Sequence, residues 1–345
     1  MMNTIGAIVY GDISIQLFVV FAILSYYFDN KCADYKFYTR EDATQQATQA
    51  TQATQHTYFW DTIFSNIGSK VYPDKTVKET YTMALDYVYK EIPVYADDAI
   101  VDGYFRSPKY FAHNIEKIKT LLGFEEKINN VLAKYPEYSM NKTIVIQHII
   151  NCDIQERLGP ADNNHHIQLY QVVHKPKYFI EAFKVLLERG VDIYDYDILY
   201  VCRETDNKIV NYYNQEINKA LKELTGKDLR YKKVSDDIPV WEQLFITTSA
   251  KHHIIPNGTF AWFGAYLSTS KDAIVCYPKT WLGSKFDGTI AEDDLFPNSW
   301  YKVAGNNTDD LFPDNWLKID EGYNETDLSP ETYYKDIRIV NELQK

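Results

Sequence analysis

Residues 250–267 have the types and the order that could hold a phosphate group. A short apolar run, Ile254-Ile255, is followed by the turn Pro256-Asn257-Gly258, and Thr259 then opens an aromatic helix. The first N–H groups of a helix have no partner inside the helix, and the helix dipole favours negative charge at that end. The pattern therefore predicts a buried strand, a tight turn and an anion-binding helix start, with Thr259 as its cap or as a hydroxyl donor to the ligand. The plainer interpretation is an ordinary strand–helix unit whose aromatic residues fill the core.

This stretch resembles a signature of the family 11 glycosyltransferases, the α-1,2-fucosyltransferases, in which a strand precedes Asn-Ser-Ser-Phe-Ser-Trp-Trp and a helix. Three further blocks resemble segments of that family and follow its order: YFWDTIFSNI (58–67), DGYFRSPKYF (102–111) and PKTWLG (278–283). The resemblance covers nearly the whole chain. It implies an α/β fold of two facing Rossmann-like domains, the GT-B architecture, with an acceptor-side domain over 1–141 and a donor-binding domain over 142–345.

The resemblance also implies an enzyme that transfers a sugar, with inversion and without a metal or other cofactor, from a nucleotide-diphosphate sugar to a glycan hydroxyl. GDP-fucose is the default donor and an α-1,2 linkage the default product. The donor-binding positions that it implies are His148, Asn151, Asp153, Arg203, His253, Asn257, Gly258, Thr259 and Phe260. The acceptor-side positions are Asp102, Tyr104, Phe105 and Arg106, and the N-terminal turn supplies Gly11, Asp12, Ser14 and Gln16.

Two departures from the family's motifs bear on activity. The family's His-x-Arg-Arg-Gly-Asp segment, whose first arginine is expected to contact the donor pyrophosphate, has Ile150 and Asn151 here in place of both arginines. Loss of an arginine–phosphate pair should weaken binding about ten- to a hundredfold. At another strand end Arg203 replaces an acidic residue; it either supplies a cation to the diphosphate or is a solvent-exposed loop arginine. The alternative to an active enzyme is therefore a non-catalytic descendant that binds a glycan or scaffolds a partner.

Several candidate residues also have a structural interpretation. His148 keeps its aligned position, but a lone histidine at a strand end is commonly a core residue, and the same alternative holds for His253. Asp102 could act as a base towards an acceptor hydroxyl, or it is a turn residue. In the N-terminal turn, which is glycine-rich in the family, Asp12 puts a negative charge near the expected path of the anionic donor, and Ser14 could cap the following helix. The histidines have no carboxylate spacing that would indicate a metal site.

Composition limits the class of protein further. The 345 residues carry a formal net charge of −12, which argues against a nucleic-acid partner because polyanion binding needs a basic face. The apolar run over 15–28 is shorter than the roughly 18 residues needed to span a bilayer, so we expect no transmembrane segment. The cysteines show no metal-ligand spacing, and we expect free thiols in a reducing, cytoplasmic compartment. They are Cys32, Cys152, Cys202 and Cys276.

Hydrophobic periodicity predicts how the chain alternates between strands and helices. The predicted strands are 5–10, 143–150, 198–202, 254–255 and 274–277. The predicted helices are 14–29, 76–90, 108–122, 125–133, 176–189, 206–224, 238–248 and 259–267. This alternation is typical of parallel sheets that bind ligands at the carboxyl ends of their strands. The Ala-Thr-Gln repeats of residues 43–55 indicate a flexible insertion, and we interpret the tandem segments DDLFPNSWYKV (293–303) and DDLFPDNWLKI (309–319) as a duplicated surface loop.

Overall fold

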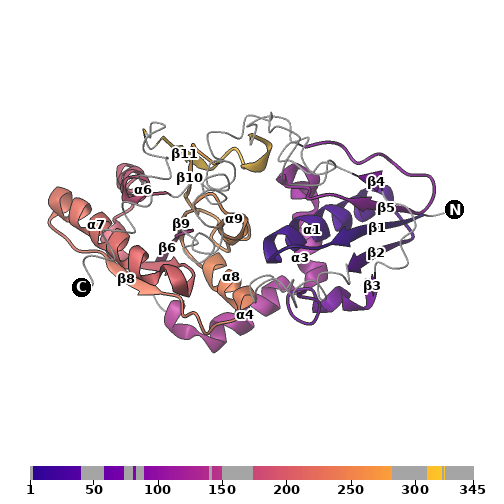
Figure 1. Cartoon of the computed structure of the whole chain (residues 1–345), viewed down its shortest axis with the longest axis horizontal. Helices are drawn as coiled ribbons and strands as arrows, with labels where there is room; N and C mark the ends of the chain where they lie inside the picture. The colour runs from indigo at the N-terminus through magenta and orange to yellow at the C-terminus, as the bar shows by residue number, and fades with distance from the viewer. Residues whose placement is uncertain are drawn as a thin grey trace, which may run out of the picture. The chain divides into compact units, whose positions relative to one another are not determined.

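The computed structural model describes residues 3–39, 58–73, 81–82, 89–139, 142–149, 174–281, 309–320 and 322. They divide into two compact units (Figure 1). Unit 1 contains the described residues up to Asn130 and residues 309–314; unit 2 contains those from Val131 to Trp281 and the described residues from Asn315 onward. The division therefore falls eleven residues before the boundary at 141 expected from the sequence (141 − 130), and residues 309–314 join the first unit, not the second. The insertion predicted over 43–55 lies outside the described residues.

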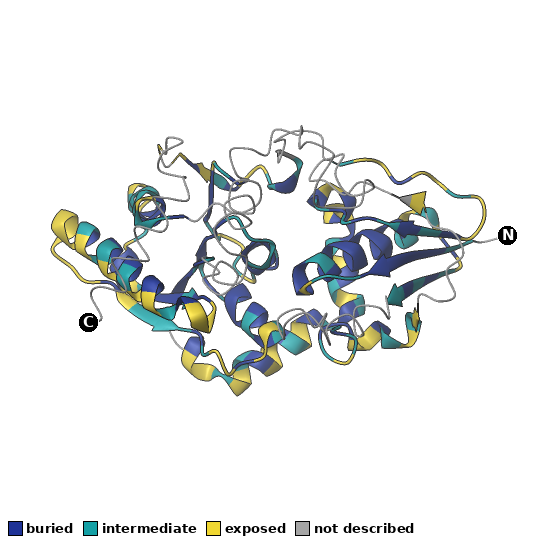
Figure 2. Ribbon diagram, viewed as in Figure 1, coloured by how far each residue is buried: buried dark blue, intermediate teal, exposed yellow. Residues whose placement is uncertain are grey.

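Unit 1 is built on a five-stranded sheet in the order β3-β2-β1-β5-β4, and all its paired strands are parallel. The strands are β1 (Thr4–Val9), β2 (Asp34–Thr39), β3 (Val71–Pro73), β4 (Tyr81–Thr82) and β5 (Ala99–Asp102). The helix α1 (Ile13–Asn30) returns the chain from β1 to β2 and is dark blue along most of its length in Figure 2, because it is a core helix. Among the described helices it alone is long and apolar enough to cross a membrane by length and composition, and 72% of that window is buried inside the structure.

The rest of unit 1 corrects two helix predictions. The helix expected over 108–122 is divided into the 3-10 turns η4 (Pro108–Tyr110) and η5 (Ala112–Asn114) and the helix α3 (Ile115–Leu122), with the Ser107 side chain capping the first turn. The helix expected over 76–90 is wrong at Tyr81–Thr82, which forms β4 beside β5. The remaining short elements are η2 (Ser65–Lys70) and η9 (Asp309–Leu311), and α4 (Phe124–Lys134) leads into unit 2.

Unit 2 is built on a six-stranded sheet in the order β11-β10-β9-β6-β7-β8, again with every pair parallel. The strands are β6 (Thr143–Gln147), β7 (Asp197–Val201), β8 (Arg230–Lys233), β9 (His252–Ile254), β10 (Val275–Pro278) and β11 (Leu317–Ile319). The helices are α6 (Pro176–Glu188), α7 (Asn207–Thr225), α8 (Val240–Thr248) and α9 (Thr259–Tyr266), with 3-10 turns η6 (Pro136–Tyr138), η7 (Ile193–Asp195) and η8 (Glu204–Asp206). Parallel sheets connected by helices confirm the predicted α/β fold class.

Side chains alternate across the sheet of unit 2, and each face has its own helices. Ile144 and Ile146 of β6 belong to a buried cluster that also contains residues of α6 and α7. Val145 and Gln147, between and after them, line a pocket with residues of α8 and α9. The helices therefore cover both faces of the sheet. The residues that directly follow the strands form the edge at which the strands end, which we call the carboxyl edge.

The second tandem segment corrects our interpretation of it as a surface loop. Leu311 is 0% exposed, and residues 317–319 form β11 at one side of the sheet of unit 2. The ring of Trp316 is buried and lies 5.7 Å from that of Trp262 in α9. This segment is therefore part of the core. The first copy lies outside the described residues.

Candidate functional site

The carboxyl edge of the unit 2 sheet brings together residues that lie far apart in the sequence. Strands β7, β6 and β9 are neighbours, and Gln147 at the end of β6 pairs with Val201 at the end of β7. The backbone N–H of His148 donates to the Val201 carbonyl at 2.9 Å, which extends this pairing by one residue. Parallel sheets bind ligands at the edge where their strands end, so the residues after these three strands form the candidate site.

The turn before α9 leaves the start of that helix accessible. Gly258, not Thr259, is the N-cap residue, and no side chain caps the helix. Thr259 is the first helical residue, and it is partly exposed together with Asn257 and Phe260. The first backbone N–H groups of α9 therefore lie at the carboxyl edge, where the helix dipole favours an anion.

Gly258 lies so close to the segment after β6 that a larger residue would displace the end of the Ile149 side chain. A Cβ atom on Gly258 would lie 2.1 Å from Cδ1 of Ile149, far inside van der Waals contact. The glycine thus permits the start of α9 to lie directly against the segment that follows β6. This close approach joins two parts of the predicted donor site.

One of the two polar atoms of the Asn257 side chain has a hydrogen-bond partner, which holds this side chain in place. Its Nδ2 donates to the Trp281 carbonyl at 3.1 Å, while its Oδ1 is shielded from solvent and has no hydrogen-bond partner among the described residues. A buried acceptor without a partner is costly. A donor group of a ligand would satisfy this oxygen only after the atoms that cover it move.

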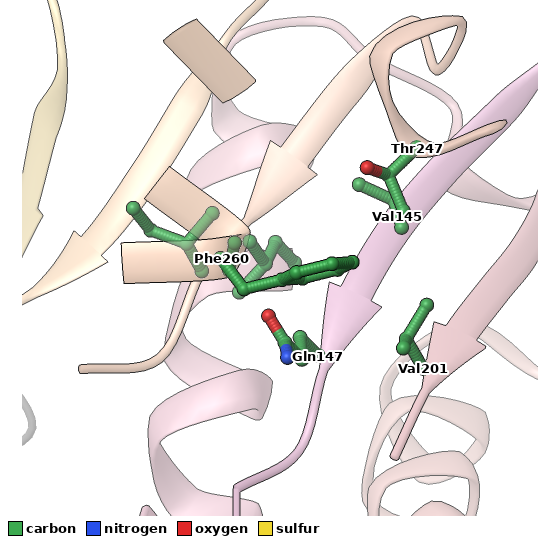
Figure 3. Close-up of a pocket in the computed structure, with 8 residues that line it drawn as sticks. Val145, Gln147, Val201, Thr247 and Phe260 are labelled. Carbon is green, nitrogen blue, oxygen red and sulfur yellow. The ribbon is translucent and has the colours of Figure 1, made fainter. Parts of the chain in front are cut away.

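A small pocket lies beside Gln147 on the face covered by α8 and α9. Figure 3 shows the Gln147 amide next to the Phe260 ring, with Val145, Val201 and Thr247 around it. The pocket has a volume of about 10 Å³, which is close to what one water molecule needs. A nucleotide cannot enter it, so a donor would have to lie across the edge and not inside the pocket.

The histidines of unit 2 support the structural interpretation. His148 is 3% exposed, its Nε2 lies 3.2 Å from Oδ1 of Asn214, and burial lowers its pKa to about 4. His253 is fully buried within β9, and burial, followed by the neighbouring His252, lowers its pKa to about 3. Both are neutral at pH 7. We therefore leave His253, a predicted donor-binding residue, out of the candidate site. His148 is a buried residue that supports the carboxyl edge.

Arg203 is a cation that follows β7 at the carboxyl edge. It is exposed, has extended backbone (φ −66°, ψ 151°) and stands two residues beyond Val201. Lys251 lies at the opposite edge, because its backbone N–H donates to Thr143 at the start of β6. The Nζ of Lys251 lies 3.5 Å from a carboxylate oxygen of Asp272. The predicted donor residues Asn151 and Asp153 lie outside the described residues.

In unit 1 the N-terminal turn is held together by its own side chains. Asp12, not Ser14, caps α1: its Oδ1 accepts from the backbone N–H groups of Ser14 and Ile15, each at 3.0 Å, and from the Ser14 hydroxyl at 2.6 Å. Gln16 is buried and its Nε2 donates to the Gly11 carbonyl at 2.9 Å. Gly11 has φ +79°, a left-handed conformation that favours glycine. The Asp12 carboxylate, which we expected near a donor, is thus occupied with the helix start.

The block after β5 alternates between buried and half-buried residues. Asp102, Tyr104 and Arg106 are half-buried, whereas Phe105 between them is 0% exposed. The Phe105 ring packs edge-on against Tyr110 at 5.3 Å, so the acceptor-side role predicted for Phe105 is corrected to a core role. Tyr10, which the sequence did not single out, pairs with Tyr104 at 5.4 Å. The feature of the sequence that could have indicated Tyr10 is its position directly after the first strand.

The described residues contain no group of three or more His, Cys, Asp or Glu side chains that could hold a metal ion. Within the same residues Cys32, Cys202 and Cys276 are free and buried, and burial raises the pKa of the last two thiols to about 12.

No protein-family model matches the chain. Among curated proteins, it is similar to the O-antigen biosynthesis glycosyltransferase WbnK of Escherichia coli, with 21% identity over 194 residues. The match covers 55% of this chain and 57% of that protein, so the chain spans a little over half the length of this relative. In sequence the chain is glycosyltransferase-like, while the narrower resemblance to family 11 stays a prediction.

Three solved structures are among those that match the chain, each at low sequence identity. A mutant of Arabidopsis thaliana FUT1 in complex with GDP is 10% identical, covers 80% of this chain and 70% of its own, and gives a TM-score of 0.42. A family 9 glycosyltransferase from Veillonella parvula is 8% identical, with coverage of 98% and 97% and a TM-score of 0.38. ADP-heptose LPS heptosyltransferase II of E. coli is 9% identical, with coverage of 99% of both chains and a TM-score of 0.39.

Proposed function

We propose that the protein is a glycosyltransferase of the family 11 type, which transfers fucose from GDP-fucose to a glycan hydroxyl with inversion and forms an α-1,2 linkage. The observation that carries this proposal is the accessible start of α9, behind Asn257 and Gly258, at the carboxyl edge of β9. This is the position at which the family signature and the general rule for parallel sheets both expect an anionic ligand. The similarity to a bacterial glycosyltransferase supports the same class of reaction.

In the proposed complex the donor diphosphate lies against the first N–H groups of α9. The Thr259 hydroxyl donates to a phosphate oxygen, and the Asn257 Oδ1 accepts from a donor group of the nucleotide sugar. Arg203 approaches the diphosphate from the end of β7 and replaces the cation that the two missing motif arginines would supply. A guanidinium binds phosphate oxygens in a bidentate manner, which neither isoleucine nor asparagine can do.

The transfer needs no metal in this scheme. The acceptor hydroxyl attacks the anomeric carbon of the sugar and forms the new glycosidic bond, while the bond from that carbon to the diphosphate breaks. GDP leaves with the electron pair, and the hydroxyl proton passes to a general base. Stabilising the leaving diphosphate is the largest electrostatic task, and the α9 start and Arg203 perform it.

A second function is favoured by one specific observation, the replacement of both motif arginines by Ile150 and Asn151. A descendant that has lost its nucleotide would bind a glycan, or a partner glycosyltransferase, without transferring sugar. Under either function we propose a reducing, cytoplasmic location, which the free, buried thiols of Cys32, Cys202 and Cys276 support. No nucleic acid partner is proposed, in keeping with the net charge of −12.

A screen of nucleotide sugars by thermal unfolding tests the proposal. A ligand at about 100 times its dissociation constant stabilises the native state by about 2.7 kcal/mol, a readily measured rise in melting temperature. We expect GDP-fucose and GDP to give the largest rises, and UDP- and ADP-sugars little. A protein that responds to none of these nucleotides but to glycans would favour the non-catalytic function.

A further inference from the structure

Unit 1 contains a second cluster of side chains, at the end of its sheet that corresponds to the carboxyl edge of unit 2. Strand β1 pairs with β5 in parallel, with Ala7 opposite Val101, and the same register places Tyr10 level with Tyr104 beyond the strand ends. Their rings lie 5.4 Å apart at an interplanar angle of 72°, and both are half-buried. They form an aromatic surface at the carboxyl edge of this sheet, where parallel sheets bind ligands.

The turn that carries Tyr104 is strained and anchored. Phe105 has φ +50°, a left-handed conformation that costs a residue with a Cβ about 1–3 kcal/mol. Its ring is held in the core by Tyr110, and the Ser107 backbone N–H donates to the Phe105 carbonyl at 2.7 Å. The Ser107 hydroxyl donates to the Asp310 carbonyl at 2.5 Å. Because these inward-facing residues are fixed, Tyr104 and Arg106 are directed to the other side.

Arg106 completes the cluster as a stacked cation. Its guanidinium carbon lies 4.2 Å from the centre of the Tyr104 ring. A guanidinium held over an aromatic ring is restrained by this contact, and its planar N–H groups form a fork that matches a carboxylate. The Nε atom is shielded from solvent, so the terminal Nη groups are the donors that a ligand could reach. The matching family block has a glutamine at this position, which carries no charge.

We propose that Tyr10, Tyr104 and Arg106 bind a sugar residue that carries a carboxylate, so that the acceptor glycan of this protein contains a uronic acid. The aromatic rings pack against the carbon-bound hydrogens of the pyranose, and the Arg106 fork binds the carboxylate at C6. Asp102, at the end of the adjacent strand, accepts hydrogen bonds from the ring hydroxyls. The inference rests on the proposed function only in naming this sugar an acceptor, because its binding requires no donor.

The test is a titration of the full-length protein with two sugars that differ only at C6, methyl β-galacturonide and methyl β-galactoside, followed by calorimetry or ligand-observed NMR. We expect the galacturonide to bind about tenfold or more tightly than the galactoside. Arg106→Gln should remove this preference by weakening the galacturonide alone, and Arg106→Lys should retain part of it. Tyr104→Ala should weaken both sugars.

The matched control is Lys36→Gln, which removes another ring-associated cation of unit 1, one that lies 5.7 Å from the Tyr72 ring. It should keep the preference intact, and thermal unfolding of each variant confirms that it is folded. Equal affinity for both sugars, undetectable binding of the galacturonide, or a preference that survives Arg106→Gln would overturn the inference.

Two further measurements distinguish a uronate from another anionic sugar, and this inference from the proposed function. Galactose 6-phosphate replaces the carboxylate by another anion, and tighter binding of this sugar than of the galacturonide would overturn the choice of a uronate. A protein that binds galacturonide through Arg106 but transfers no sugar contradicts the proposed function and leaves this inference standing. Transfer of sugar to neutral galactosides, without any preference for uronates, supports the proposed function and contradicts this inference.

Discussion

Gly258 and Ile149 approach so closely that a Cβ on the glycine would lie 2.1 Å from Cδ1 of the isoleucine. The first residue precedes α9 and the second follows β6, so this approach fixes the start of the helix against the neighbouring strand end. The donor site that we propose depends on this arrangement, because the helix N–H groups must face the carboxyl edge.

Gly258→Ala should therefore turn the end of the Ile149 side chain to another conformation, lower the free energy of unfolding by about 0.5–1.5 kcal/mol and weaken nucleotide binding. Adding Ile149→Ala to this variant should recover much of the stability, because it removes the colliding atom. Urea unfolding of the two single variants and the double variant measures the coupling. Simple additivity of the two single effects would show that the residues do not interact in this way.

The second prediction concerns pH. Burial lowers the pKa of His253 to about 3 from an ordinary value of 6.5, so the unfolded chain binds a proton at this residue below about pH 6.5 and the native state does not. The stability is fully present above about pH 6.5 and falls as the pH drops towards 3, by about 1.4 kcal/mol for each pH unit. His148, with a pKa of about 4, contributes in the same direction.

His253→Gln should reduce this dependence on pH, whatever it does to stability at pH 7. The measurement is urea unfolding at about pH 5, 6 and 7, and the readout is the slope of unfolding free energy against pH. A slope as steep in His253→Gln as in the natural chain would contradict a neutral, buried His253.

The third prediction tests the second tandem segment as part of the core. Trp316 packs against Trp262, and the strand β11 begins at the next residue, so Trp316→Ala should cost about 3–5 kcal/mol. Trp241→Ala is the comparison within unit 2, because Trp241 is only half-buried and should cost clearly less. Thermal and urea unfolding give both values. If Trp316→Ala costs no more than Trp241→Ala, the segment contributes little to the core.

The sequence predicted β6, β7 and β10 of unit 2, because each contains a continuous apolar run. It missed β8 (Arg230–Lys233), three of whose four residues are charged, as expected for a strand at the side of a sheet, and β11, which is only three residues long. It also missed the break in the helix after Pro108, since apolar periodicity continues through residues that form 3-10 turns. The local sequence pattern was sufficient to predict a strand where both faces of that strand are buried.

The candidate sites were predictable only in part. The turn before α9 was found because Asn257-Gly258 interrupts an apolar stretch. For His253 the sequence left a donor-binding role and a core role open, and its place inside β9, which begins at His252, decides for the core. The pairing of Tyr10 with Tyr104 depends on the register of two strands more than 90 residues apart (104 − 10 = 94), which no local pattern contains.

The central claim, that Arg203 replaces the missing motif arginines at the donor diphosphate, is tested most directly by calorimetric titration with GDP. Arg203→Ala should weaken GDP binding about tenfold or more, as expected for loss of a charge-assisted contact. Arg230→Ala is the matched control, because Arg230 pairs with Asp197 at the start of β7, away from the carboxyl edge, and should bind GDP like the natural chain. Ile150→Arg should add little if Arg203 already supplies the charge. Equal GDP affinity in Arg203→Ala and in the natural chain would contradict the account.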